Sequence, residues 1–384
     1  MGYYTNNGGL IGTTRLGEKK GVYDLVLSQH NNTLFVFSEF TFTSPNEDPF
    51  APTSTEITNQ GPYSSSNFAS DTSFFQVSEG IQYFTIPQTA NYTITAKGAS
   101  GKNVSGASYE GGGGILRASF SLIQGTILGI LVGQRPPTSG ATTRLWQGGG
   151  GGTFVTTTSS VGSNETATPL IVAGGGAGSR STNPTYSRAN MSPNGYNGNG
   201  SDGGTQGDHA EAGGQNATGG GGAAGWDGFP SNHADCRNIY TPSGYPQSST
   251  CSVAYPKARP FNTSSSNPGQ GGIFNTGYDT SYRGSGGFGG GGPGGWGGAG
   301  GGGGYSGGGN GNNSSTEYAG GGGSFISSSA IDTSASGKNI GTSTGSWSSG
   351  SGAFSGHSIL STASGLANLG YNTSQNGSVI LERW

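Results

Sequence analysis

The sequence predicts an all-β protein in which strands are interleaved with a bundle of polyglycine II helices and no significant α-helix forms. Glycine fills 81 of 384 positions, and much of it falls in short runs. Between the runs, apolar and polar residues alternate over strand lengths, which is the period of a half-buried β-strand. No segment shows the apolar period of an amphipathic helix. Strands and glycine runs are therefore the elements to be explained.

The glycine-rich stretch 283–309 governs how the other elements are interpreted. A glycine run loses more backbone entropy on ordering than any other sequence, so in isolation it behaves as a flexible linker. Here, however, Pro293, Trp296, Ala299 and Tyr305 are separated by multiples of three. This spacing matches a polyproline II helix with three residues per turn. We expect these side chains to share one edge, with Trp296 and Tyr305 on the outside of the bundle.

The other two edges of such a helix would be bare backbone. A polyproline II helix makes no internal hydrogen bonds, so its buried N–H and C=O groups must pair with a neighbouring segment. Five shorter glycine runs are available as neighbours, at 111–114, 148–152, 174–176, 219–222 and 320–323. We expect parallel and antiparallel packing of these runs with main-chain hydrogen bonds between them. The alternative is a random Gly/Ser linker.

Strand patterns lie on both sides of the glycine runs. Segments 34–37 and 39–43 alternate or run apolar over strand lengths, and prolines then break the pairing. Segment 116–122 shows the clearest alternation, and 127–132 is apolar apart from one glycine, as in a fully buried strand. The other predicted strands are 74–77, 82–86, 92–96, 153–156, 170–173 and 379–381.

The composition excludes several classes of function. Charged residues make up only 9% of the chain, and the formal net charge is −3. This surface offers no basic patch for phosphates, so no nucleic acid is expected as a partner. The amino terminus, MGYYTNNGGL, has no basic region followed by an apolar run, and no stretch of about 18 apolar residues could span a membrane. We therefore expect neither a signal peptide nor a membrane span.

We assign no catalytic residue, cofactor or metal ligand from the sequence. Residues 304–308, GYSGG, match a nucleophile-elbow pattern, but they lie in a glycine run without the strand, helix and Asp and His partners that an elbow needs. Two histidine clusters lack four ligands at a zinc spacing. They are His209 with Asp208 and Glu211, and His233 with Asp235 and Cys236. Calcium bound by loop carboxylates and carbonyls stays open.

Glycine density falls between the runs at 227–270, where a long irregular insertion is either functional or disordered. Trp226, Tyr240, Tyr245 and Tyr255 punctuate it and are the candidate stacking platforms for a sugar or protein partner. The alternative is that the insertion is a structural spacer.

The same insertion contains both cysteines of the chain, Cys236 and Cys251. A disulfide between them would stabilise the fold by roughly 3 kcal/mol in the loop-entropy model. Two free thiols are the alternative in a reducing cytoplasm.

The first 30 residues form a separate attachment segment in this interpretation. Gly-Leu10-Ile11-Gly is followed by Arg15 and then by Gly-Val22-Tyr23-Asp-Leu25. This order resembles the short amino-terminal segment of many marine bacteriophage virion proteins, in which a Gly-Leu-Ile-Gly element precedes a Gly-Val-Trp-Ser-Leu-like one. Tyr and Asp stand here where Trp and Ser are usual. The resemblance implies that these side chains anchor the protein on the particle. An ordinary terminal strand is the alternative.

A second resemblance covers about 300 residues of the chain. Its motifs, in order, are 80–82 (GIQ), 86–87 (IP), 92–94 (YTI), 128–134 (LGILVGQ), 148–155 (GGGGGTFV), 169–176 (PLIVAGGG), 199–201 (NGS), 219–226 (GGGGAAGW), 286–308 and 324–326 (SFI). They resemble the glycine-rich extracellular domain of the anaplastic lymphoma kinase and leukocyte tyrosine kinase receptors. The cysteines that flank that domain's opening strand are missing around 39–43.

This resemblance implies a tumour-necrosis-factor-like β-sandwich interleaved with polyglycine helices. The chain then divides into an attachment segment at 1–30, a sandwich part at 31–173, and a polyglycine bundle at 174–323 with its insertion loop at 227–270. Strands in 324–384 return to the sandwich. Similar modules occur in virus adhesins and tail fibres, but fold resemblance alone does not decide function.

Together these features predict a non-enzymatic virion protein of a marine bacteriophage, as a tail fibre, appendage or adhesin. It would be made in the host cytoplasm, dock on other virion proteins through its amino terminus, and act as a homo-oligomer. Its loops would contact a host cell-surface protein or saccharide. One alternative is a self-assembling fibre or capsid-decoration protein, in which strand 34–43 completes the sheet of the next subunit. Another is a ligand-binding receptor fragment of a eukaryote.

Overall fold

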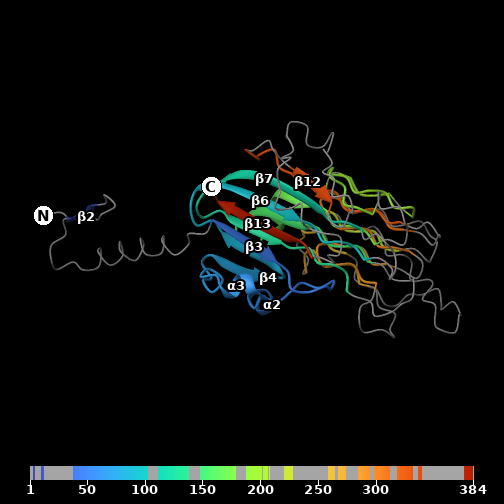
Figure 1. Ribbon diagram of the computed structural model, residues 1–384, viewed down its shortest axis with the longest axis horizontal. Coiled ribbons are helices and arrows are strands. Elements are labelled where there is room, and N and C mark those ends of the chain that lie inside the picture. The colour runs from blue at the N-terminus through green and yellow to red at the C-terminus, as the bar shows by residue number, and fades with distance from the viewer. Residues whose placement is uncertain are drawn as a thin grey trace.

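The computed structural model describes residues 3–4, 10–12, 38–102, 111–137, 148–178, 187–200, 202–205, 207, 220–227, 258–263, 267–273, 284–294, 298–311, 318–331, 336–339 and 376–383. Within these residues the chain is all-β, as predicted, with two large antiparallel sheets (Figure 1). The helices described are short: α2 (Ser54–Thr58), α3 (Gly61–Ser64) and the 3₁₀ helix η1 (Asn164–Thr166).

Eleven strands form the two sheets, and every neighbouring pair is antiparallel. The five-stranded sheet has the order β12 (Ser336–Asn339), β7 (Gly114–Leu122), β6 (Ala90–Lys97), β13 (Ser378–Arg383) and β3 (Glu39–Thr43). The six-stranded sheet has the order β11 (Phe325–Ile326), β10 (Thr168–Ala173), β9 (Thr153–Thr158), β8 (Ile127–Leu131), β5 (Ile81–Thr85) and β4 (Phe75–Ser78). A separate pair joins β1 (Tyr3–Tyr4) to β2 (Leu10–Gly12).

The predicted strands from residue 39 onward all have counterparts in these sheets. Segment 34–37 lies outside the described residues. The strands β11 and β12 lie in the range 324–384, where strands were expected to return to the sandwich, but their positions were not predicted, because neither shows an alternating pattern of strand length. The last strand of the chain, β13, lies inside the five-stranded sheet, between β6 and β3.

One hydrophobic core joins the two sheets. Side chains of the five-stranded sheet, such as Phe42 and Val379, and of the six-stranded sheet, such as Phe84 and Val155, belong to the same buried cluster. The strand register explains why these side chains are buried together. Val379 lies opposite Phe42, so the two side chains point to the same face of the sheet. Burying one such side chain contributes about 1.5–3 kcal/mol.

The short helices cover the end of this core beside β3. Helix α2 begins with a capping box: the Thr53 hydroxyl accepts from the Glu56 N–H (3.3 Å), and the Glu56 carboxylate accepts from the Thr53 N–H (2.7 Å). Two orphan donors of the helix start are thereby satisfied. Ile57 and Tyr63 then bury their side chains in the core, so both helices are held by packing as well as by the cap.

The capping box predicts a pH-dependent contribution to stability. Hydrogen bonds from the Thr53 N–H and hydroxyl, and then from Asn46, lower the pKa of Glu56. A lowered pKa in the folded state stabilises the protein above the unfolded pKa, and this stability is lost as the pH falls through the folded value. We expect Glu56→Ala to cost about 1 kcal/mol at neutral pH. The difference from wild type should shrink on acidification. Urea denaturation over a pH series measures it, with Glu56→Gln, which keeps an acceptor, as the pH-insensitive control.

Glycine segments continue the strands beyond the sheets. Five such segments adjoin β6, β7, β9, β10 and β11, and Figure 1 shows them together at one end of the sheets. Two of them, 148–152 and 174–178, close a cycle of main-chain hydrogen bonds with segment 298–311: Gly150 N–H to Gly176 O (2.7 Å), Gly175 N–H to Gly303 O (2.6 Å) and Gly303 N–H to Gly150 O (2.9 Å). The prediction that glycine runs pair through their backbones is confirmed for the described runs, and a random linker is excluded there.

Stretch 283–309 departs from the prediction of one continuous helix. Gly289 and Gly290 have φ values of +104° and +82° and form a turn, and Phe288 beside them is fully buried. The expectation that the non-glycine side chains share one outer edge of the helix is wrong for Pro293 and Ala299. Both residues are buried, and Ala299 belongs to a cluster with two other alanines. Trp296 lies outside the described residues.

Candidate functional site

The glycine segments lie at one end of the domain, and Ser38 and Arg383 lie at the other. Just before β13, the Gly377 N–H bonds to Gly133 O (2.8 Å) beside the glycine segments. At the other end of β13, the Arg383 N–H bonds to Ser38 O (2.9 Å). Ser38 is the residue through which the amino-terminal segment enters the domain. We call the end at Ser38 and Arg383 the proximal end and the end formed by the glycine segments the distal end (Figure 1).

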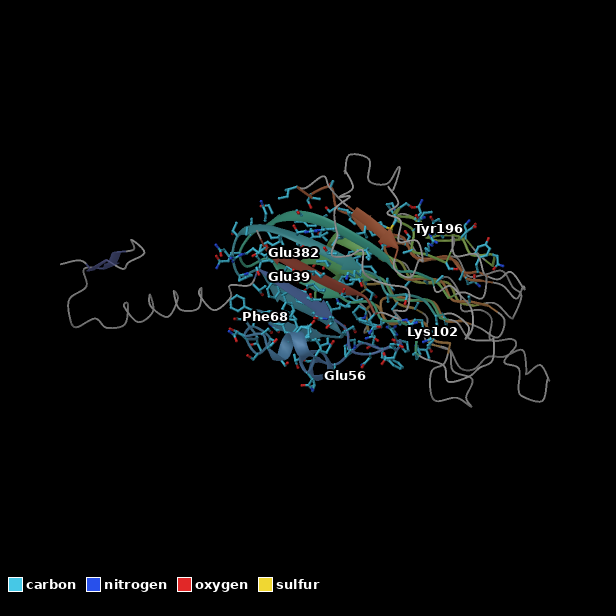
Figure 2. All side chains as sticks on the ribbon, viewed as in Figure 1. Glu39, Glu56, Phe68, Lys102, Tyr196 and Glu382 are labelled. Carbon is cyan, nitrogen blue, oxygen red and sulfur yellow. The ribbon has the colours of Figure 1, made fainter. Side chains whose placement is uncertain are left out.

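Main-chain hydrogen bonds fix the ends of the glycine segments at the distal end. The Gly101 N–H bonds to Gly111 O (2.9 Å), and the Lys102 N–H bonds to Gly148 O (3.1 Å). Figure 2 shows Lys102 over the glycine segments and Glu382 over the sheets. These ends of the described glycine segments are therefore held in place by backbone pairing.

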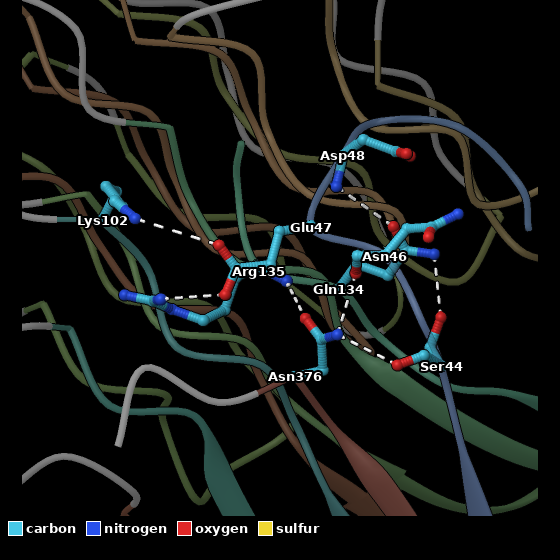
Figure 3. Close-up of polar contacts among 8 residues, drawn as sticks. All are labelled: Ser44, Asn46, Glu47, Asp48, Lys102, Gln134, Arg135 and Asn376. Atoms are coloured by element: carbon cyan, nitrogen blue, oxygen red, sulfur yellow. Dashed lines mark hydrogen bonds and ion pairs between the residues drawn. The ribbon is translucent and has the colours of Figure 1, made fainter. Parts of the chain in front are cut away.

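A cluster of polar residues lies where the sheets meet the glycine segments (Figure 3). We call it the junction cluster: Ser44, Asn46, Glu47, Asp48, Lys102, Gln134, Arg135 and Asn376. At its centre, Arg135 Nη1 lies 3.2 Å from Glu47 Oε1, with the arginine side chain 1% exposed. Lys102 Nζ lies 4.0 Å from Glu47 Oε2. A buried guanidinium is costly unless an opposite charge faces it, which Glu47 supplies.

Amides complete the junction cluster and connect its segments. The Asn376 side chain accepts from the Arg135 N–H (2.8 Å) and donates to the carbonyls of Ser44 (3.0 Å) and Asn46 (2.8 Å). The Gln134 side chain donates to Ser44 Oγ (2.8 Å). Three segments far apart in sequence are thereby joined: the exit of β3, the exit of β8 and the entry to β13.

Asp48 connects the cluster to the glycine segments. Its carbonyl accepts from the Phe288 N–H (2.9 Å), and its N–H donates to the Gln134 side chain (3.2 Å). Burial raises the pKa of the Asp48 carboxyl, the Phe50 N–H lowers it in part, and the nearby charge of Glu56 raises it. The hydrogen bonds and ion pairs of this cluster orient its groups, and the arrangement is chemically that of a structural joint.

Trp226 lies in the interior. Its side chain is 8% exposed and stacks on Phe261, with ring centroids 5.1 Å apart, and Phe261 stacks on Phe154 at 5.3 Å. The expectation that Trp226 contacts a partner is therefore corrected. The Asn262 N–H also bonds to Trp226 O (2.8 Å), so ring stacking and a main-chain hydrogen bond together hold Trp226 against residues 261–262 of the insertion.

Tyr305 and Ser306 also serve the packing of the domain. Tyr305, expected on the outside, is half-buried and stacks on Phe325 with ring centroids 4.4 Å apart. Ser306, the middle residue of the GYSGG pattern, is fully buried, and its hydroxyl accepts from the Gly207 N–H (2.9 Å). No strand or helix flanks it within 298–311, so the geometry of a nucleophile elbow is not formed.

The remaining predicted site residues are placed only in part. Leu10 and Ile11 belong to β2, which pairs with β1. The other residues proposed for attachment, contact or a disulfide, and the two histidine clusters that were not assigned as metal sites, lie outside the described residues: Arg15, Val22, Tyr23, Leu25, Tyr240, Tyr245, Tyr255, Cys236, Cys251, Asp208, His209, Glu211, His233 and Asp235. Among the described residues, no group of three His, Cys, Asp or Glu side chains could hold a metal ion.

Sequence reasoning missed the junction cluster. A charged residue directly after the buried strand 127–132 was a usable signal, because only 9% of the chain is charged and Arg135 follows that strand closely. Its partner Glu47 lies too far away in sequence to be inferred from a pattern.

Comparison with known proteins adds no family to this picture. Neither the protein-family models nor the curated protein sequences contain a match to this chain. Across the described part of the chain, no helix is both long and apolar enough to pass through a bilayer.

Proposed function

We propose that this protein is a non-enzymatic bacteriophage virion protein, a tail fibre, appendage or adhesin that presents loops for attachment to the host surface. The proposal rests on the difference between the two ends of the domain. Ser38, which follows the amino-terminal segment, lies at the proximal end, and the glycine segments lie at the distal end. An anchor on the particle would therefore point the distal end outward.

The glycine segments suit a scaffold for such loops. We propose that they are polyglycine II helices attached to a tumour-necrosis-factor-like β-sandwich. Their hydrogen bonds run between segments, and the two sheets share one core. A bundle fixed through its backbone leaves the connecting loops free to vary in sequence, because loop side chains are not needed to hold it. The partner would be a host-surface protein or saccharide, recognised mainly by uncharged groups.

The insertion at 227–270 remains the proposed contact loop, with Tyr240, Tyr245 and Tyr255 as its stacking side chains. The stem formed by Trp226 and Phe261 supports this role, because their stacking brings together described residues on both sides of segment 228–257. The fibre alternative, with 34–43 pairing to the next subunit, has less support. Residues 39–43 already pair with β13 of the same chain, and the Thr43 N–H bonds to the Tyr63 hydroxyl (2.9 Å).

Two deletions test the proposal. Removing residues 1–30 should abolish incorporation into particles while the domain stays folded, as measured by immunogold labelling of particles and by circular dichroism. Replacing 228–257 with a short Gly/Ser linker should keep the Trp226 stem and abolish adsorption of the purified protein to host cells. Label at a few places on each particle supports an adhesin. Continuous fibres that the purified chain builds through residues 34–43, or undiminished adsorption after both deletions, would refute the proposal.

A further inference from the structure

The carboxy-terminal strand completes the five-stranded sheet from within. β13 pairs with β6 from Ser378 to Arg383 and with β3 from Ser378 to Glu382. In the strand order of the described sheet, β3 meets only β13. Without β13, two rows of backbone N–H and C=O groups on β3 and β6 would face an empty space, which is an unstable arrangement for strand edges. The space between β3 and β6 therefore requires a strand.

Residues 376–383 make the contacts that fix the position and register of this strand. Val379 and Leu381 are buried in the core at 0% and 1% exposure, and Glu382 pairs with Arg117 at 3.0 Å. Asn376 bonds into the junction cluster at one end, and Arg383 Nη1 donates to Gln88 at the other (2.8 Å). Both termini of the segment and its buried face are thus specified, so a one-residue slip would place the wrong side chains in the core.

We infer that the space between β3 and β6 is a strand-binding site that a second copy of this chain can fill with its own residues 376–383. The contacts are the same whether the strand comes from the same chain or another, as in domain swapping. Only the covalent connection differs. Residues 340–375, rich in Gly and Ser, precede the strand and can span on the order of 100 Å when extended.

Concentration decides which copy supplies the strand. A covalent connection of this length gives an attached strand an effective concentration of about millimolar or lower, falling with connection length. Exchange is therefore expected where copies are crowded at comparable concentrations, and self-closure where they are dilute. This inference concerns assembly between copies and does not depend on the proposed attachment to a host.

Cysteine pairs placed across β3 and β13 test the inference. Thr41 lies opposite Ile380 in the register. The Thr43 N–H bonds to Tyr63 and so points away from β13, which by alternation makes Thr41–Ile380 a pair without mutual hydrogen bonds. The Cα atoms of such pairs are about 4.5 Å apart, within disulfide range. Thr43 and Ser378 form a second pair of this kind if the first prevents folding.

The decisive sample mixes two singly substituted chains, Thr41→Cys and Ile380→Cys, with tags of different size and with Cys236 and Cys251 changed to Ser. They are unfolded together, refolded over a range of concentrations and oxidised. We expect a disulfide-linked heterodimer whose yield rises in proportion to concentration, and a monomeric internal disulfide in the Thr41→Cys/Ile380→Cys double variant when dilute. The control pairs Thr41→Cys with Ile123→Cys, an exposed position (68%) away from β13. A heterodimer yield no higher than this control overturns the inference, as does a double variant that fails to close.

Discussion

Replacing Gly175 with alanine is expected to destabilise the protein by about 3–5 kcal/mol. A Cβ at this position would lie 2.2 Å from Gly150 O and 2.7 Å from Gly151 O, both main-chain atoms. Neither can move aside freely, because Gly150 is itself bonded to Gly176 and Gly303. The added methyl group must therefore part the segments and weaken the hydrogen bonds that close their cycle. Urea denaturation of purified protein measures the loss.

Gly61→Ala is the matched control for the chemistry of the substitution. Gly61 is the first residue of α3, and a Cβ there would meet nothing within 4 Å. Alanine should change the stability by less than about 1 kcal/mol, because the reduced entropy of the unfolded chain is opposed by the crowding of a Cβ before Pro62. If both variants unfold at the wild-type urea concentration, the glycine segments are not packed as described. Rapid amide exchange of Gly175 and Gly303 in the wild type would contradict the packing independently.

Much of the framework could be predicted because its signals are local. Strand 116–122 alternates apolar and polar residues, and β7 buries that pattern at Gly114–Leu122. The glycine runs predict backbone pairing for an equally local reason, since a chain without side chains has only its amides to offer. In both cases the sequence of a few residues limits the partner that the segment can accept.

The features of the fold that could not be predicted depend on contacts between residues far apart in the sequence. Phe288 and Trp226 look like isolated aromatics in polar or glycine-rich surroundings, yet both enter the second core cluster beside Phe154. The insertion of β13 between β3 and β6 could not be foreseen from its pattern, which fits an edge position equally well. Helices α2 and α3 are too short to show an apolar period, and only the cap of α2 at Thr53 marks them.

The second large predicted effect is a loss of stability in the junction cluster, because burial determines how much its Glu47–Arg135 ion pair contributes to stability. Glu47→Gln should destabilise the protein by about 2–3 kcal/mol, below the 3–5 kcal/mol typical for breaking a fully buried pair. The Arg135 side chain is 1% exposed, while that of Glu47 is 33% exposed and partly screened by water. Removing the carboxylate charge leaves the guanidinium in its buried position without the charge that faces it. Urea denaturation at neutral pH measures the change.

Glu382→Gln is the control that shows whether the loss of stability depends on the burial of an ion pair or on the distance between its charges. Glu382 and Arg117 are closer, at 3.0 Å, but their side chains are 33% and 28% exposed. We expect a loss below about 1 kcal/mol, and about 1 M salt should reduce it further because the screening length falls to about 3 Å. The Glu47→Gln loss should persist in salt, and adding Arg135→Met should restore part of it, since removing both charges ends the desolvation cost. Equal losses for the two glutamates would mean that the guanidinium of Arg135 is reached by water and that the junction is not a dry joint.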